Sequence, residues 1–178
     1  MTRILAFLVV AAAISGVDAQ KPRVSRPAVA AMEKSFDQRI ERMRPEEPLV
    51  LMGNTRGVYL EGYGAVFTSE VSLINVPNLT PFRPSYSKEE IARIHTRKLQ
   101  RLPVLKQGMR QMMLAAAASL DEVPATEQIA VGVSLFYFSW EDTSGLPSQV
   151  LMLAEKQKLL DAQAGRTSID SFLAVREF

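Results

Sequence analysis

The pattern of hydrophobic and polar positions is most regular from Ser87 to Leu120, where it predicts one long amphipathic helix. Ser87 begins this helix with a capping box, because its hydroxyl accepts a backbone N–H of the first turn while Glu90 reaches back to the Ser87 N–H. Most steps between apolar residues are three or four, which places them on one helical face. The residues of this apolar face are Ile91, Ile94, Leu102, Leu105, Met109, Met112, Met113, Ala116 and Leu120.

Three residues within this helix depart from the simple pattern. Pro103 removes one backbone donor and crowds the Leu99 carbonyl, so it predicts a kink or a break. Because the apolar positions keep their register across Pro103, we expect one kinked helix with Pro103 and Gly108 off the apolar face; two helices meeting at Leu102 are the alternative. Lys98 stands where an apolar residue is due, and we expect its stem to lie along the core edge while its ammonium reaches water.

A shorter amphipathic helix is predicted nearer the N-terminus and is ended by the prolines at positions 45 and 48. Its apolar residues again recur at steps of three and four. The segment before it, residues 20–27, is basic and contains proline, so we expect it to be a disordered lead-in. The apolar residues of this helix are Val29, Met32, Phe36, Ile40 and Met43.

Four strands are predicted from alternation and from β-branched and aromatic residues: 58–61, 65–74, 129–137 and 150–154. Gly62-Tyr63-Gly64 separates the first two, either as a tight hairpin turn, which we favour, or as glycine bulges in one longer strand. A short helix over residues 156–164 follows the fourth strand.

The order of elements predicts an α+β domain spanning residues 28–178. We expect a two-layer fold in which a four-stranded, mainly antiparallel sheet in a β-β-α-β-β-α order is covered by the long kinked helix and preceded by the N-terminal amphipathic helix. Phe136 and Phe138 alternate with Val133 and Leu135, so both faces of the third strand are expected to be apolar. We favour the N-terminal helix as the cover of the far face over an exposed patch that binds a partner.

The first 19 residues have the pattern of a secretory signal peptide. Arg3 supplies a positive start, residues 4–14 are an unbroken apolar run too short to span a bilayer comfortably, and Val17-Asp18-Ala19 offers small residues at the cleavage site. We therefore expect a periplasmic or secreted protein with no transmembrane span after cleavage near Ala19; an uncleaved anchor is the alternative. The chain contains no cysteine, so its stability must come from its core.

The residues suited to catalysis are few. His95 is the only histidine and there is no cysteine, so we expect no metal site, no cofactor and a structural or surface role for His95. Ser85 and Lys88 match S-x-x-K, a motif that places a lysine beside a nucleophilic serine in some acyl-transferases. Its supporting segments are absent, so we favour Ser87 as a helix cap and Ser85 as a loop residue, and name no catalytic residue.

Arg93, Arg97 and Arg101 recur every four residues on the side of the long helix that the pattern places away from the core. Such a row would suit an anionic partner, such as a phosphate, a lipid head group or an acidic protein. A solvated face is the simpler interpretation and the one we favour. Nucleic acid is disfavoured by the net charge of only +2 and by the export signal.

Three segments together resemble small uncharacterised exported bacterial proteins: Gly62-Tyr63-Gly64-Ala65-Val66-Phe67, Leu102-Pro103 and Val175-Arg176-Glu177. The resemblance implies no reaction, no ligand and no functional residue. With no credible nucleophile–base pair, we expect a non-catalytic binding or interaction domain of the bacterial cell envelope, whose partner is an envelope protein or an anionic surface. A small envelope hydrolase that uses the Ser85–Lys88 pair or a pair of carboxylates is the alternative.

Export is directly testable. Because the cleavage site follows Ala19, N-terminal sequencing of the protein recovered from an exporting bacterium should begin at Gln20. Recovery of the full-length chain from the cytoplasm alone would contradict the predicted localisation.

Overall fold

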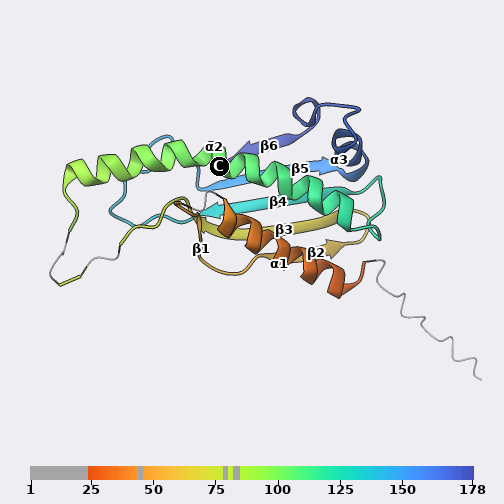
Figure 1. Cartoon of the computed structure of the whole chain (residues 1–178), viewed down its shortest axis with the longest axis horizontal. Coiled ribbons are helices and arrows are strands. Elements are labelled where there is room, and N and C mark those ends of the chain that lie inside the picture. Colours follow the sequence, from red (N-terminus) through yellow and green to blue (C-terminus); the bar gives the residue numbers. More distant parts are fainter. Residues whose placement is uncertain (1–23, 44–45, 78–79, 82–84) are drawn as a thin grey trace, which may run out of the picture.

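The computed structural model describes residues 24–43, 46–77, 80–81 and 85–178. Within these residues the fold is α+β, with a mixed six-stranded sheet and three α-helices (Figure 1). The predicted signal peptide lies outside the described residues. The elements are α1 (Arg26–Arg42), β1 (Val50–Leu51), β2 (Arg56–Leu60), β3 (Gly64–Ser72), α2 (Lys88–Ser119), β4 (Gln128–Leu135), β5 (Gln149–Glu155), α3 (Lys156–Gln163), a 3-10 turn (Ile169–Ser171) and β6 (Ala174–Glu177).

The sheet is larger and less antiparallel than the sequence predicted. Its order is β1-β3-β4-β5-β6, with β2 also paired to β3. The antiparallel β2–β3 and β4–β5 pairs are confirmed, but β3 and β4 run parallel because α2 carries the chain back along the sheet between them. The prediction of four strands missed β1 and β6, which have only two and four residues and no clear alternation.

Both long helices lie on the same face of the sheet (Figure 1). The Phe36 ring of α1 packs against Phe67 of β3 with ring centroids 4.9 Å apart, and Phe36 and Met109 belong to one buried core. The expectation that α1 covers the far face is therefore wrong. The helix also begins at Arg26, inside the segment predicted to be disordered, while residues 20–23 lie outside the described part of the chain.

One continuous helix through Pro103 is confirmed for α2, and Pro103 itself is exposed. The predicted capping box is present: the Glu90 N–H donates to the Ser87 hydroxyl over 3.2 Å, and the Ser87 N–H donates to the Glu90 carboxylate over 2.9 Å. Gly108, however, is buried, because α1 crosses there and a Cβ would overlap the Met43 side chain. No helix in the described residues is both long and apolar enough to cross a membrane.

Lys156 completes the C-terminal end of α2. The last turn of α2 contains no basic residue, and its free carbonyls carry the negative end of the helix dipole. Buried Lys156, which begins α3, donates to the Leu120 carbonyl over 2.8 Å and to the Val123 carbonyl over 2.7 Å. Burial lowers the pKa of Lys156, and the nearby Asp121 carboxylate opposes that shift.

Two carboxylates of α1 accept hydrogen bonds from backbone N–H groups in or next to β2, the strand at one side of the sheet. Glu33 accepts from the Gly57 N–H over 2.7 Å, and Asp37 accepts from the Thr55 N–H over 2.8 Å. A hydrogen bond from Arg26 lowers the pKa of Glu33, and burial opposes that shift. An edge strand with open donors is a template for pairing with another chain, so α1 blocks this part of the edge.

The favoured hairpin reading of Gly62-Tyr63-Gly64 is confirmed. Leu60 pairs with Gly64, and the Tyr63 N–H donates to the Leu60 carbonyl over 3.0 Å. Gly62 has a φ of 77° at the third position of this turn, where a type II turn requires positive φ. Gly64 has a φ of 132° and lies directly against the backbone of Gln128. The end of the hairpin therefore packs closely against the start of β4.

The two glycines should respond differently to the same substitution. Gly62→Ala meets open space and should lower the free energy of unfolding by about 1 kcal/mol, the cost of a positive φ alone. Gly64→Ala combines that cost with an overlap of its Cβ and the Gln128 carbonyl, and should lower it by about 3 kcal/mol or more. Urea denaturation measures both; equal losses would show that the close approach does not limit position 64.

Candidate functional site

A hollow of about 510 Å³ lies beside the first half of α2, where the helix extends past the end of the sheet (Figure 1). It is bounded by the segment that leaves β3 and by the first turns of α2. Its polar and apolar lining residues are Asn75, Val76, Pro77, Tyr86, Glu90, Arg93, Ile94 and Arg97.

The floor of the hollow is apolar and is held in place by an aromatic stack. Val76 and Ile94 belong to a small second core, separate from the main one. The Tyr86 ring, which lines the hollow, stacks on Trp140 with centroids 4.5 Å apart, and Trp140 stacks on Phe138 at 5.5 Å. The Tyr86 hydroxyl donates to the Pro77 carbonyl. Because the Trp140 ring stacks on both Tyr86 and Phe138, these contacts position the Tyr86 side of the hollow.

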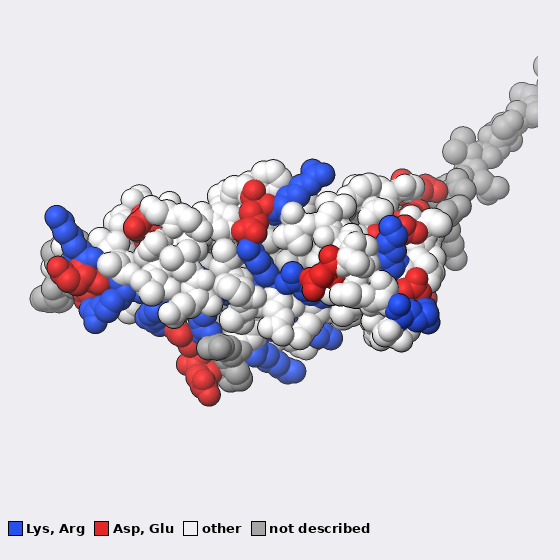
Figure 2. Space-filling model, turned by 90° about the horizontal axis from the view of Figure 1, so that it is seen from above, with Lys and Arg blue, Asp and Glu red and all other residues white. Residues whose placement is uncertain are grey.

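Arg93 and Arg97 supply the positive charge of the hollow. Arg93 is exposed, and no carboxylate in the described part of the chain forms an ion pair with it. Arg97 is half exposed and forms an ion pair with Glu47. Figure 2 shows acidic and basic side chains interspersed over the face seen from above, without a continuous basic strip. The positive charge at this site therefore comes from these two guanidinium groups, and Glu90 adds a carboxylate to the lining.

Arg101, the third member of the predicted row, does not face solvent. It is 4% exposed, lies 2.9 Å from the Glu47 carboxylate and donates to the Glu47 carbonyl. Glu47, which precedes β1, lies against this turn of α2, and the helical pattern alone cannot show that contact. The expectation that all three arginines project away from the core is wrong for Arg101, so the charged surface is reduced to Arg93 and Arg97.

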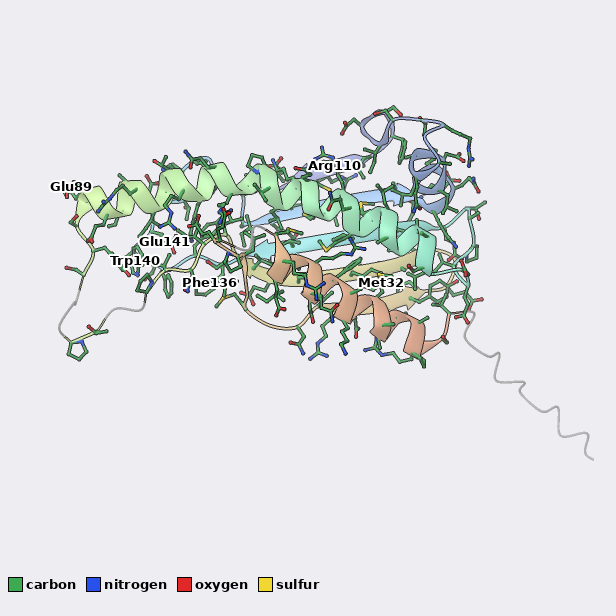
Figure 3. All side chains as sticks on the ribbon, viewed as in Figure 1. Met32, Glu89, Arg110, Phe136, Trp140 and Glu141 are labelled. Carbon is green, nitrogen blue, oxygen red and sulfur yellow. The ribbon has the colours of Figure 1, made fainter. Side chains whose placement is uncertain are left out.

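The prediction that the Lys98 ammonium reaches water is also wrong. Lys98 is fully buried and forms an ion pair with Glu141, whose side chain is 1% exposed. The ammonium lies 4.7 Å from the centre of the Tyr137 ring and 3.5 Å from the Phe136 carbonyl. Glu141 also accepts from the Phe138 N–H over 3.1 Å. Figure 3 shows Glu141 with Phe136 and Trp140 beneath the first half of α2.

Burial sets the protonation behaviour of this cluster. It lowers the pKa of Lys98, and the hydrogen bond and charge of Glu141 oppose that shift. It raises the pKa of Tyr137 to about 12, with Glu141 adding to the effect. The Tyr137 hydroxyl donates to the Pro147 carbonyl over 2.9 Å. Since the ion pair has no solvent access, it fastens the chain after β4 to α2 and offers no surface to a substrate.

The other candidate residues have local roles. His95 has Nε2 2.7 Å from the Ser144 carbonyl and Nδ1 3.9 Å from Asp142, so it ties α2 to the loop before β5, in agreement with a structural role. Hydrogen bonds from Ser144, followed by the charge of His95, lower the pKa of Asp142. Ser85 and Lys88 are both exposed, whereas Ser87 serves as the helix cap. No group of three metal-ligating side chains converges within the described residues.

Sequence reasoning missed the aromatic stack and the Lys98–Glu141 pair. A signal existed for the pair, because Lys98 interrupts an apolar face, but its partner lies on a distant segment. Comparison with protein-family models, with curated proteins and with solved structures finds no significant match for this chain. Its function must therefore be argued from the residues of the site.

The buried pair predicts a specific pattern of stability. Glu141→Gln leaves the Lys98 charge buried without its counter-charge and should lower the free energy of unfolding by about 3 kcal/mol. Adding Lys98→Met removes that charge and should recover most of the loss. Thermal and urea denaturation of the single and double variants test this.

The solvent-accessible pair Lys106–Glu177 supplies the matched control. Glu177→Gln should cost less than about 1 kcal/mol, because water screens that pair. A Glu141→Gln variant no less stable than Glu177→Gln would contradict the assignment of a buried ion pair.

Proposed function

We propose that this chain is a non-catalytic, exported binding domain of the bacterial cell envelope and that its hollow beside α2 binds an anionic group carried by an apolar molecule. One observation carries the proposal: Arg93 and Arg97 line the same hollow as the apolar residues Val76 and Ile94. A guanidinium fork matches a phosphate or a carboxylate, and an apolar floor beside it suits an acyl chain. A lipid of the envelope with an acidic head group has both features.

The two arginines have different roles in this proposal. Arg93 makes no ion pair within the described residues, so its guanidinium is available for the first contact with an incoming anion. Arg97 is already paired with Glu47, and an anionic ligand must compete with that carboxylate. Glu47 is also held by Arg101 from below, so it remains in place when Arg97 turns toward a ligand.

The export part of the proposal is supported by sequence features. Arg3, the apolar run of residues 4–14 and the small residues before Gln20 together suit a secreted precursor. An envelope location would bring the hollow close to acidic lipid head groups, whose surface attracts basic side chains.

Vesicle binding tests this function. The protein should co-sediment with phosphatidylglycerol vesicles, should not co-sediment with phosphatidylcholine vesicles, and should bind less as salt is raised. The double variant Arg93→Gln/Arg97→Gln should bind on the order of tenfold more weakly with an unchanged melting temperature, since both side chains are exposed.

The double variant Arg39→Gln/Arg42→Gln on α1 is the matched control, because it removes the same charge from exposed positions away from the hollow. It should retain binding. An equal loss of vesicle binding in both double variants would show that binding depends only on overall charge. Absence of wild-type binding to phosphatidylglycerol vesicles would reject a lipid ligand.

A further inference from the structure

One face of the sheet is left uncovered by every described element. The buried residues of β3, β4 and β5 that meet the helices are the alternate ones, such as Phe67, Val131 and Met152. The helices α1 and α2 both pack on that side (Figure 1), and α3 contributes Leu159 to the same core. A parallel strand pair such as β3–β4 normally has both faces buried.

The uncovered face carries an unbroken apolar row across five strands. Strand pairing places Val58 opposite Val66, Val66 opposite Ala130, Ala130 opposite Leu153, and Leu153 opposite Ala174. We call these five residues the apolar row. Val58 is 48% exposed and Ala130 only 2%, so the row is more accessible to solvent at its β2 end than at its centre. Leu60, also 48% exposed, and Leu151 flank it.

We infer that this face is an interface with a second copy of the chain, in which the apolar rows of two copies pack together across a two-fold axis that runs along the row. Edge-to-edge assembly through β2 is disfavoured, because α1 occupies the Thr55 and Gly57 donors there. Face-to-face packing of two sheets needs apolar side chains between them. This face supplies the apolar row, while the next positions along β3 and β4 are polar or small, such as Thr68 and Gln128.

Charge complementarity selects a second copy as the occupant. Glu155 lies on β5, two residues along the strand from the row, and pairs with Gln128. Arg176 lies on the neighbouring strand β6, two residues from the row on its other side, and pairs with Leu151. Rotation by 180° about the row exchanges the two sides. In the dimer, Glu155 of one copy then faces a position on β5 of the other copy. Arg176 lies on β6, one strand spacing of about 4.8 Å to the side of that position. The same rotation generates two such pairs, as a two-fold interface requires.

Neither charge has a strong partner in its own chain. Arg176 is exposed and makes no ion pair within the described residues. The contact of Glu155 with Lys158 is 3.8 Å long, and both side chains are partly exposed. The face measures about 24 by 20 Å for five strands of about six residues. Each copy would therefore bury on the order of 500 Å², which is the low end for a specific interface and predicts a concentration-dependent dimer.

Sedimentation equilibrium tests this inference. The protein is purified after expression of the full chain and measured at concentrations from about 1 µM to about 1 mM. The wild type should pass from one copy to two. Leu153→Glu should raise the dimer dissociation constant by on the order of 100-fold while the circular dichroism spectrum and melting temperature hold, because the side chain is partly exposed in the single copy. Leu99→Glu, at an exposed leucine of α2 away from this face, should leave the dimer intact.

Charge exchange separates this arrangement from other modes of association. Arg176→Glu and Glu155→Arg should each weaken the dimer by on the order of tenfold, and the double variant should restore it. A wild-type protein that stays monomeric throughout this concentration range would overturn the inference. That outcome includes the case in which this face binds a different protein. A dimer whose dissociation constant is unchanged by Leu153→Glu would also overturn it. So would a double variant whose loss of dimer affinity equals the sum of the losses in the two single variants.

Discussion

The structure depends on a mismatch in length between α2 and the sheet that it covers. With 32 residues, α2 is about 48 Å long, whereas the nine residues of β3 span about 30 Å. The second half of α2 buries its apolar face on β4 and β5 in the main core. The first half extends past the sheet, and its inward face must be covered by other segments. That requirement explains the small second core, the aromatic stack that packs against it and the hollow beside them.

Two buried charges lie in the half of α2 that extends past the sheet. Lys98 and Arg101 are both buried in the first half of α2 and meet carboxylates on two different connecting segments, Glu141 and Glu47. A buried ion pair adds little net stability compared with apolar packing, but an unpaired charge in the same place is costly. These pairs therefore specify where the connecting segments lie along the helix, and in doing so they shape the site that Arg93 and Arg97 border.

The described residues divide the molecule into a covered and an uncovered side. On the covered side, both long helices lie over the sheet (Figure 1), and the main core lies between them and the sheet. On the other side, the sheet presents the apolar row, flanked by Leu60 and Leu151 and by the charged residues Glu155 and Arg176. The hollow and the row belong to opposite faces, so a ligand at the hollow and a second copy on the row would not compete for the same surface.

The sequence by itself determined the features that depend on near neighbours. The extent of α2, its passage through Pro103, the Ser87–Glu90 capping box and the hairpin at Gly62 follow from spacing and from the conformations that these residues allow. Helix α1 and the antiparallel β4–β5 pair were predictable for the same reason.

Only the tertiary structure decided features that depend on distant partners. The side of the sheet that α1 covers, the parallel β3–β4 pair and the burial of Lys98 and Arg101 each join segments far apart in the chain. Arg101 meets Glu47 across 54 positions, and no periodicity encodes that contact. A helical pattern states which side of α2 is apolar, but whether a charged residue on another side meets water or a carboxylate depends on which chain segment passes over it. The candidate site lies among such contacts, so the sequence predicted two of its charges and not its shape.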